Sequence, residues 1–213
     1  MNVEAAALRY RPLGRFAEGF ARGKMGGDPA YATVLAQLPA RGTLLDVGCG
    51  EGYLLALAAE ESPALELVGL DHDPRRLEQA RVALADRTTT LSAEDARVAV
   101  LPAADVVTCL DVLHYQPVPE QDALIARLAA ALRPGGKLLV RDGASDGGWR
   151  SAITALSERM MVALGRHRGD GVYFRPRAAT QAAMERCGLV VDAVDCAAGT
   201  PFANVLFVGT RPG

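Results

Sequence analysis

The stretch LLDVGCGEGY, residues 44–53, decides the fold of this 213-residue chain. Its apolar opening predicts a short strand, and the apolar residues from position 53 onward predict the helix that follows. Between them lie Gly48, Gly50 and Gly52, preceded by Asp46. Glycines in a strand-to-helix turn permit positive φ angles and let main-chain N–H groups come close to a ligand. The stretch is therefore either a plain turn or a ligand site, and the rest of the chain has to distinguish the two.

Strand-like and helix-like segments alternate on both sides of this stretch. Strands are expected at 43–48, 66–71, 88–91, 105–111 and within 133–142, and helices at 53–62, 74–85 and 119–132. Such alternation is typical of right-handed βαβ units in a parallel sheet that helices cover on both faces. Two last strands, 189–196 and 204–210, are expected to pair as a hairpin. The predicted fold is an α/β, three-layer Rossmann-like sandwich with a seven-stranded, mostly parallel sheet and an antiparallel C-terminal hairpin.

A chain of this length suits a single domain, 1–213, in which four segments can be assigned. We expect an N-terminal helical lid at 1–40, in which Asp28-Pro29 starts a helix, and a cofactor-binding core at 41–142. A substrate-side helical insert at 143–188 and the closing hairpin at 189–213 complete the chain.

Composition narrows the class of protein. Half of the residues are hydrophobic and 23% are charged, as in a packed globular domain. A net charge of −2 favours neither nucleic acid nor an anionic membrane as partner. The four cysteines lie far apart without paired metal spacing, which indicates reduced thiols in the cytoplasm and no metal site. There is no signal-like N-terminus and no membrane-spanning apolar run, so the expected localisation is cytoplasmic.

The loop itself excludes two common phosphate-binding motifs. A P-loop requires Gly-Lys-Ser/Thr, whereas Gly52 is followed by Tyr53. A dinucleotide loop has the G-x-G-x-x-G spacing, whereas these glycines alternate. Asp46 places a carboxylate before the first glycine, which is unfavourable beside a pyrophosphate but favourable beside an ammonium or sulfonium group. The loop therefore favours a cationic nucleoside as ligand.

With these motifs in order, the chain resembles the class I S-adenosylmethionine-dependent methyltransferases, in particular those that act on small molecules. The D-x-G-x-G-x-G at 46–52 is similar to their first motif, and RPGGKLLV at 133–140 to their turn into strand five. The resemblance covers 40–142 well, and the final hairpin matches the family's last two strands. It implies S-adenosyl-L-methionine as cofactor.

The resemblance also implies a set of site residues. Asp71, at the end of the second strand, would hold the ribose hydroxyls, and Glu94, Asp95 and Ala96 would contact adenine. Cys49 would contribute its backbone, and Tyr53 would either cover the methionine end or pack in the core. The full expected cofactor set is Asp46, Gly48, Cys49, Gly50, Gly52, Tyr53, Asp71, His72, Glu94, Asp95, Ala96, Leu110 and Arg22. For Arg22, pairing with the methionine carboxylate, pairing with an anionic acceptor and a solvated helix face all remain open.

Three residues after strand four are the catalytic candidates. Asp111 would lie beside the transferred methyl group, and His114 has the unperturbed pKa near 6.5 that suits a general base. A structural role for His114 is equally open. Tyr115 would hydrogen-bond to the acceptor or stack on it. Asp111 and Asp142 lack a third acidic neighbour, which argues against a metal-dependent mechanism.

The acceptor is expected to be small and partly apolar, aromatic or polyketide-like, and methylated on oxygen or carbon, as in secondary metabolism. CLDVLHY lacks the Asn/Asp-Pro-Pro-aromatic motif of amino-methylating relatives. The aromatic and basic N-terminal segment and the insert at 149–174, rich in aromatics and methionines, would line its pocket. The sequence leaves three alternative functions open: a non-catalytic cofactor-binding module, an RNA or protein methyltransferase, and an NAD-dependent oxidoreductase. Basic residues at 166–177 support the RNA acceptor. A homodimer is also left open.

Overall fold

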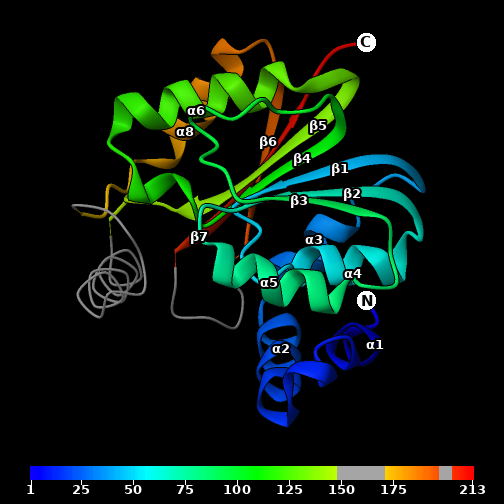
Figure 1. The fold of residues 1–213 in the computed structure, drawn as a ribbon. Coiled ribbons are helices and arrows are strands. Elements are labelled where there is room, and N and C mark those ends of the chain that lie inside the picture. The colour runs from blue at the N-terminus through cyan, green and yellow to red at the C-terminus, as the bar shows by residue number, and fades with distance from the viewer. Residues whose placement is uncertain (148–170, 197–202) are drawn as a thin grey trace. The chain divides into compact units, whose positions relative to one another are not determined.

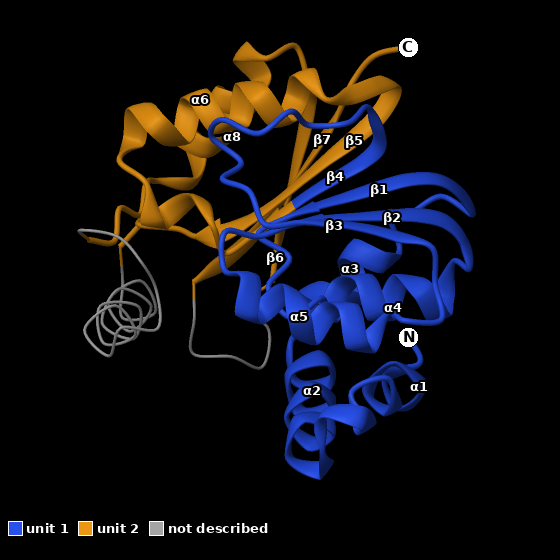
Figure 2. Cartoon of the chain, viewed as in Figure 1, with its two compact units in different colours: residues 1–108 blue, residues 109–213 orange. Residues whose placement is uncertain are grey.

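The computed structural model of the chain describes residues 1–147, 171–196 and 203–213 (Figure 1). Its seven strands form one sheet in the order β3-β2-β1-β4-β5-β7-β6. The chain divides into two compact units, residues 1–108 and 109–213 (Figure 2), which are described separately below. Strand β4 (Ala104–Leu110) runs from the first unit into the second. The expected Rossmann-like class with a seven-stranded sheet is confirmed.

The first unit is built on three parallel strands. β1 (Arg41–Val47) pairs with β2 (Ala64–Leu70), and β2 pairs with β3 (Thr89–Ser92). Val47 lies opposite Leu70, and Leu70 lies opposite Ser92, so the three strands end level with one another. Ligands of open α/β sheets bind beyond such carboxyl ends.

Two helices follow the first two strands and pack against the parallel sheet of the first unit. α4 (Tyr53–Glu61) packs against β2, and α5 (Pro74–Ala83) packs against β3. The side chain of Asp73 accepts a hydrogen bond from the N–H of Arg75 at 2.9 Å, which caps α5. Six consecutive residues of α4, Leu54 to Ala59, are buried, because the helix is covered on more than one side.

The covering on the outer side of α4 comes from the N-terminal helices. They are α1 (Val3–Leu8), η1 (Arg11–Leu13), α2 (Arg15–Gly27) and α3 (Pro29–Leu35). α1, α2 and α3 all contact α4, and η1 contacts α5. Asp28 caps α3 through a 3.1 Å hydrogen bond from the N–H of Ala30, as its sequence predicts. The N-terminal segment is therefore an integral layer of the first unit.

The second unit contains the closing antiparallel strands. β5 (Leu132–Gly143) pairs with β7 (Asn204–Thr210), and β7 pairs with β6 (Val190–Asp195). α6 (Val118–Ala130) contacts β5, and α8 (Arg177–Arg186) contacts β6, β7 and α6; the short turn η2 (Leu113–Tyr115) contacts α6 and β5. The antiparallel C-terminal hairpin is confirmed.

The boundary between α6 and β5 differs from its prediction. The helix expected at 119–132 ends at Ala130, and Leu132 already begins β5. The reason is pairing beyond the glycine turn: the N–H of Gly135 donates to Arg211, and the N–H of Arg211 donates to Gly136. Gly135 has a φ of +75°, so the strand continues through the RPGG segment that was expected to be only a turn.

Two other expectations have a narrower outcome. Most of the helical insert expected at 143–188 falls on 148–170, outside the described residues, and the division into lid, core, insert and hairpin stays a prediction. None of the helices in the described ranges is both long and apolar enough to cross a bilayer.

Candidate functional site

The glycine loop is fastened to the end of the neighbouring strand. The N–H groups of Gly48 and Cys49 both donate to the carbonyl of Leu70, at 2.7 and 3.0 Å. All three loop glycines have left-handed φ angles: +77° at Gly48, +54° at Gly50 and +80° at Gly52. This conformation favours glycine and explains why the residue recurs at alternate positions.

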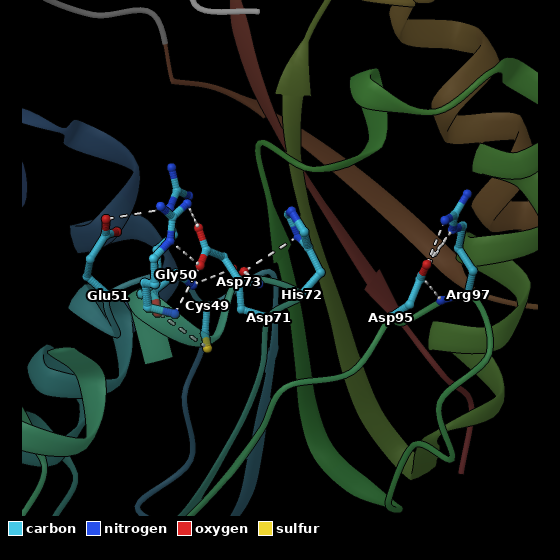
Figure 3. A network of polar contacts seen from close by, with 10 residues as sticks. Cys49, Gly50, Glu51, Asp71, His72, Asp73, Asp95 and Arg97 are labelled. Carbon is cyan, nitrogen blue, oxygen red and sulfur yellow. Dashed lines mark hydrogen bonds and ion pairs between the residues drawn. The ribbon is translucent and has the colours of Figure 1, made fainter. Parts of the chain in front are cut away.

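Asp71 follows β2 directly and joins the loop to the next turn. Its side chain is buried, and Oδ2 accepts the N–H of Gly50 while Oδ1 accepts the N–H of Asp73, each at 2.8 Å (Figure 3). Each carboxylate oxygen has about two lone-pair sites, so each can accept a second donor, and Nδ1 of His72 lies 3.5 Å from Oδ1. A vicinal diol supplies two O–H donors, which is the chemistry that this carboxylate fits.

Asp46 is a buried residue near the end of β1, before the loop. It is 4% exposed, and its Oδ1 accepts a 2.7 Å hydrogen bond from the hydroxyl of Thr108 on β4. Burial raises the pKa of Asp46 to about 7, against the lowering effect of the Thr108 hydrogen bond. The negative charge expected here is thus only partly developed near neutral pH, and a nearby cation would favour the ionised form.

Cys49 and Tyr53 flank the glycines with different surroundings. Cys49 is buried, and burial raises the pKa of its thiol well above the ordinary range, which suits a packing role. A Cβ on Gly69 would lie 2.9 Å from its Sγ, so the sulfur fills a close-packed space against β2. Tyr53 is half-buried, and its ring lies 5.1 Å from that of Tyr10 and 6.4 Å from that of Phe20.

The residues expected to contact adenine lie after β3 and already have partners. The carboxylate of Asp95 forms a bidentate pair with Arg97, and this interaction lowers the pKa of Asp95 (Figure 3). Glu94 accepts a hydrogen bond from Ser92, and Ala96 lies between Asp95 and Arg97 in the same turn. An adenine contact from Asp95 therefore has to share its carboxylate with Arg97.

His72 lies between the ribose candidate and this turn. Its Nδ1 is 3.5 Å from Oδ1 of Asp71, and its side chain is about half exposed. A charge interaction with His72 also contributes to the lowered pKa of Asp95, which places the ring near both carboxylates. Contact of His72 with the adenosine part of a ligand stays a prediction.

Arg22 is engaged on the helix surface. Its guanidinium donates to Glu4 at 2.9 Å and to Glu18, one turn earlier on α2, at 2.9 Å. Both carboxylates raise the pKa of Arg22. Contact with a cofactor carboxylate stays a prediction, and it would have to compete with these two ion pairs.

In the second unit, His114 is the centre of a buried cluster. It lies in η2 with its Nδ1 against the carboxylate of Asp142 at the end of β5, and both residues are buried. The rings of Tyr115 and Phe174 lie 4.1 and 4.9 Å from the imidazole. The N–H of Tyr173 donates to the carbonyl of His114 at 2.7 Å, which ties the segment after residue 170 to η2.

Asp111 has an unusual backbone at the end of β4. Its φ is +58°, the left-handed conformation that costs most residues energy, and Leu110 before it ends the strand. Its N–H donates to the carbonyl of Arg141, and its carboxylate forms an ion pair with the buried guanidinium of Arg141. Asp111 is therefore a charge-paired residue held in a strained conformation.

Metal ligation finds no support in the part of the chain that the structure describes. No group of three or more His, Cys, Asp or Glu residues there is arranged to hold a metal ion. The four cysteines are free thiols.

Sequence reasoning missed several partners of the candidate residues. Thr108, Arg141 and Gln121 are polar residues with buried side chains, and Gln121 donates to the carbonyls of Gln116 and Tyr173. The polar Thr108 within the apolar segment DVVTCLD was an available signal, because buried polar groups require partners. Nothing local in the sequence marks Tyr10 or Arg97.

The strand order together with the acid-and-glycine loop defines a class I methyltransferase. The sequence profile of a methyltransferase domain family matches residues 20–194. The chain therefore belongs to this family of S-adenosylmethionine-dependent methyltransferases, and S-adenosylmethionine is the family's cofactor. Asp71, whose carboxylate oxygens can each accept a further hydrogen bond, fits the ribose diol of that cofactor. A Cβ on Gly50 would lie 4.0 Å from Oδ2 of Asp71, so the loop main chain passes close to this carboxylate.

Individual relatives agree with the family assignment. The chain is 34% identical over 138 residues to the trans-aconitate 2-methyltransferase of Methylobacterium radiotolerans, covering 57% of this chain and 52% of that protein. It is 35% identical over 100 residues to the ubiquinone biosynthesis O-methyltransferase of Idiomarina loihiensis, covering 45% and 40%. The chain thus spans about half the length of these curated relatives.

A solved structure with the same fold supports the architecture over the whole chain. It is an O-methyltransferase family protein from Burkholderia thailandensis, with a TM-score of 0.72 and 22% identity. The match covers 100% of this chain and 64% of that protein.

Proposed function

We propose that this domain transfers a methyl group from S-adenosylmethionine to an oxygen or carbon atom of a small, partly apolar acceptor. The observation that carries the proposal is the buried carboxylate of Asp71, which two main-chain N–H groups hold at the carboxyl end of β2. This is the end of an open α/β sheet at which ligands bind, and each carboxylate oxygen can accept a further hydrogen bond, as a ribose diol requires.

Around Asp71, the roles of the other cofactor residues follow from their chemistry. Asp95 would accept a hydrogen bond from the adenine amine while it keeps one contact with Arg97, and Glu94, Ala96 and His72 would border the base. Tyr53 and Leu110 would cover apolar parts of the cofactor. Bound S-adenosylmethionine supplies a positively charged, methyl-donating sulfonium group, and a charge of that sign favours the ionised form of Asp46.

On the acceptor side, His114 would serve as the general base. The carboxylate of Asp142 against Nδ1 favours the tautomer that carries its proton there, which makes Nε2 the basic nitrogen. The acceptor's proton would pass to the imidazole as the new oxygen–methyl or carbon–methyl bond forms and the sulfur–methyl bond breaks. Tyr115 and Phe174 would shape the acceptor site. Asp111, whose charge is paired with Arg141, would act in catalysis as a fixed wall beside the transferred methyl group.

An apolar acceptor wall is supported by exposed aromatic residues on α2. Phe16 and Phe20 are 87% and 54% exposed, and their rings are stacked 6.4 Å apart. The ring of Phe20 also lies 6.4 Å from that of Tyr53, beside the glycine loop. Oxygen as the receiving atom is supported by the name of the ubiquinone biosynthesis relative, and a carboxylic acid as acceptor by the trans-aconitate relative. With a small acceptor of this kind, the proposal is an enzyme of secondary metabolism that works in the cytoplasm.

A transfer assay with methyl-labelled S-adenosylmethionine tests the proposal. Phenolic acids, polyketide-like acids and trans-aconitate are offered as acceptors, with bulk RNA and a protein extract as further arms. Label in a small acceptor supports the proposal, whereas label only in RNA or protein contradicts the acceptor class. Cofactor binding without transfer to any of these acceptors would identify a non-catalytic binding module.

A further inference from the structure

Tyr10 reaches the glycine loop from the N-terminal helices. The residue follows α1 and is only 1% exposed. Its hydroxyl donates a 2.8 Å hydrogen bond to the carbonyl of Glu51, and its ring lies 5.1 Å from that of Tyr53. Glu51 stands between Gly50 and Gly52, so Tyr10 contacts the loop at its main chain.

The peptide group that Tyr10 contacts joins Glu51 to Gly52. Rotation of this peptide group changes ψ of Glu51 and φ of Gly52. Glycine allows a wide range of φ, so the rotation has little steric cost on the Gly52 side. In this structure the carbonyl of Glu51 accepts from Tyr10, and the N–H of Gly52 donates to the carbonyl of Cys49 at 2.8 Å. The two hydrogen bonds hold neighbouring atoms of one peptide group and so select one orientation.

The side chain of Glu51 is held from another direction. Its carboxylate lies 3.6 Å from the guanidinium of Arg76 on α5, in the polar network around Asp71 (Figure 3). Arg76 also lies next to Gly50, at 3.8 Å from the Cβ that an alanine would carry there. The loop residue Glu51 is thus fixed through its main chain by Tyr10 and through its side chain by Arg76.

The residue before Tyr10, Arg9, makes contacts of its own in the first unit. The guanidinium of Arg9 pairs with Glu60 at 2.6 Å and with Asp86 at 2.5 Å, and it donates to the carbonyl of Ala83. These contacts join the end of α1 to the ends of α4 and α5, away from the glycine loop. Arg9 therefore offers a matched variant that loosens the N-terminal layer and leaves the loop contact in place.

We propose that Tyr10 is a positioning residue for cofactor binding, which holds the Glu51–Gly52 peptide in the orientation that keeps the glycine loop in its binding conformation. The inference rests on the proposed cofactor site at Asp71 and the glycine loop. It assigns the N-terminal layer a role in cofactor affinity, beyond any contact with the acceptor.

The test compares three variants for S-adenosylhomocysteine affinity by calorimetry, at a temperature at which each is folded by circular dichroism. Tyr10→Phe keeps the ring and its contact with Tyr53 and removes only the hydroxyl, so the variant is expected to fold. Loss of one hydrogen bond that orders the loop should weaken binding about fivefold. Arg9→Gln should leave the dissociation constant within about twofold, because none of its contacts is in the loop.

Amide hydrogen exchange provides a second readout that general destabilisation would not reproduce. In Tyr10→Phe the Gly52 amide should exchange faster than in Arg9→Gln when the two are compared at equal global stability. Unchanged affinity and unchanged Gly52 exchange in Tyr10→Phe would overturn the inference. Asp71→Ala separates this outcome from failure of the site: if it binds as tightly as the wild type, the proposed cofactor site itself is wrong.

Discussion

Replacing Gly52 with alanine should destabilise the protein more than the same change at Gly50. A Cβ on Gly52 would lie 2.9 Å from Cβ and 3.4 Å from Cα of Ala80, so α5 has to move away from the loop. A left-handed φ costs a non-glycine residue about 1–2 kcal/mol, and overpacking of this kind adds about 1–3 kcal/mol. The expected loss of unfolding free energy is therefore about 2–5 kcal/mol.

Gly50 provides the matched control for the backbone contribution. Its φ of +54° is also left-handed, but the nearest atom to a Cβ there is 3.8 Å away, an ordinary contact. Gly50→Ala should therefore cost only the backbone contribution, about 1–2 kcal/mol. Gly19 lies within α2 with open space around its Cβ position, so Gly19→Ala should stabilise by about 0.5–1 kcal/mol.

Urea unfolding followed by circular dichroism, without cofactor, measures these changes. The midpoints should fall in the order Gly19→Ala, wild type, Gly50→Ala, Gly52→Ala, from most to least stable. Equal midpoints for Gly50→Ala and Gly52→Ala would refute the close contact between the loop and α5 on which the site geometry depends.

Three further predictions concern charges and the reaction. Burial raises the pKa of Asp46 to about 7, so between about pH 4 and 7 the carboxyl is protonated in the folded protein but ionised in the unfolded chain. The stability that this group contributes to the wild type should therefore fall as pH rises through that range, and thermal unfolding of Asp46→Asn should lack this fall. Identical pH profiles for the two proteins would contradict the buried position of Asp46. Asp142→Asn should lower the methyl-transfer rate about 100-fold and shift its pH profile, with cofactor affinity within about twofold; an unchanged rate and profile excludes its role in orienting His114. Asp95→Ala should raise the S-adenosylhomocysteine dissociation constant about tenfold, against less than about twofold for Arg97→Ala, and equal effects would mean that the pair is only structural.

The sequence predicts those parts of the fold that rest on local signals. The strand, glycine loop and helix from residue 43 to 61 follow from an apolar run, a glycine turn and a second apolar run. Asp28 and Asp73 cap their helices because an acid before Pro is a local helix-start signal. The start of β5 at Leu132 was not predictable in this way, because its pairing partner Arg211 lies at the far end of the chain.

The candidate site likewise has residues that the sequence predicts and contacts that it does not. Asp46 was found by its spacing from the glycines and Asp71 through the family resemblance, and both prove to be buried. Their surroundings depend on contacts between residues far apart in sequence: Thr108 with Asp46, and Tyr10 with Glu51. Such contacts also set the raised pKa of Asp46, which spacing alone does not reveal.

The central claim is that the loop after β1 and the carboxylate of Asp71 bind S-adenosylmethionine. Isothermal titration calorimetry with S-adenosylmethionine, on the wild type and on Asp71→Ala, tests this claim most directly. We predict one site per chain and an affinity at least about tenfold weaker in the variant, because its ribose partner is removed. No binding to the wild type, or equal binding to both proteins, would contradict the account.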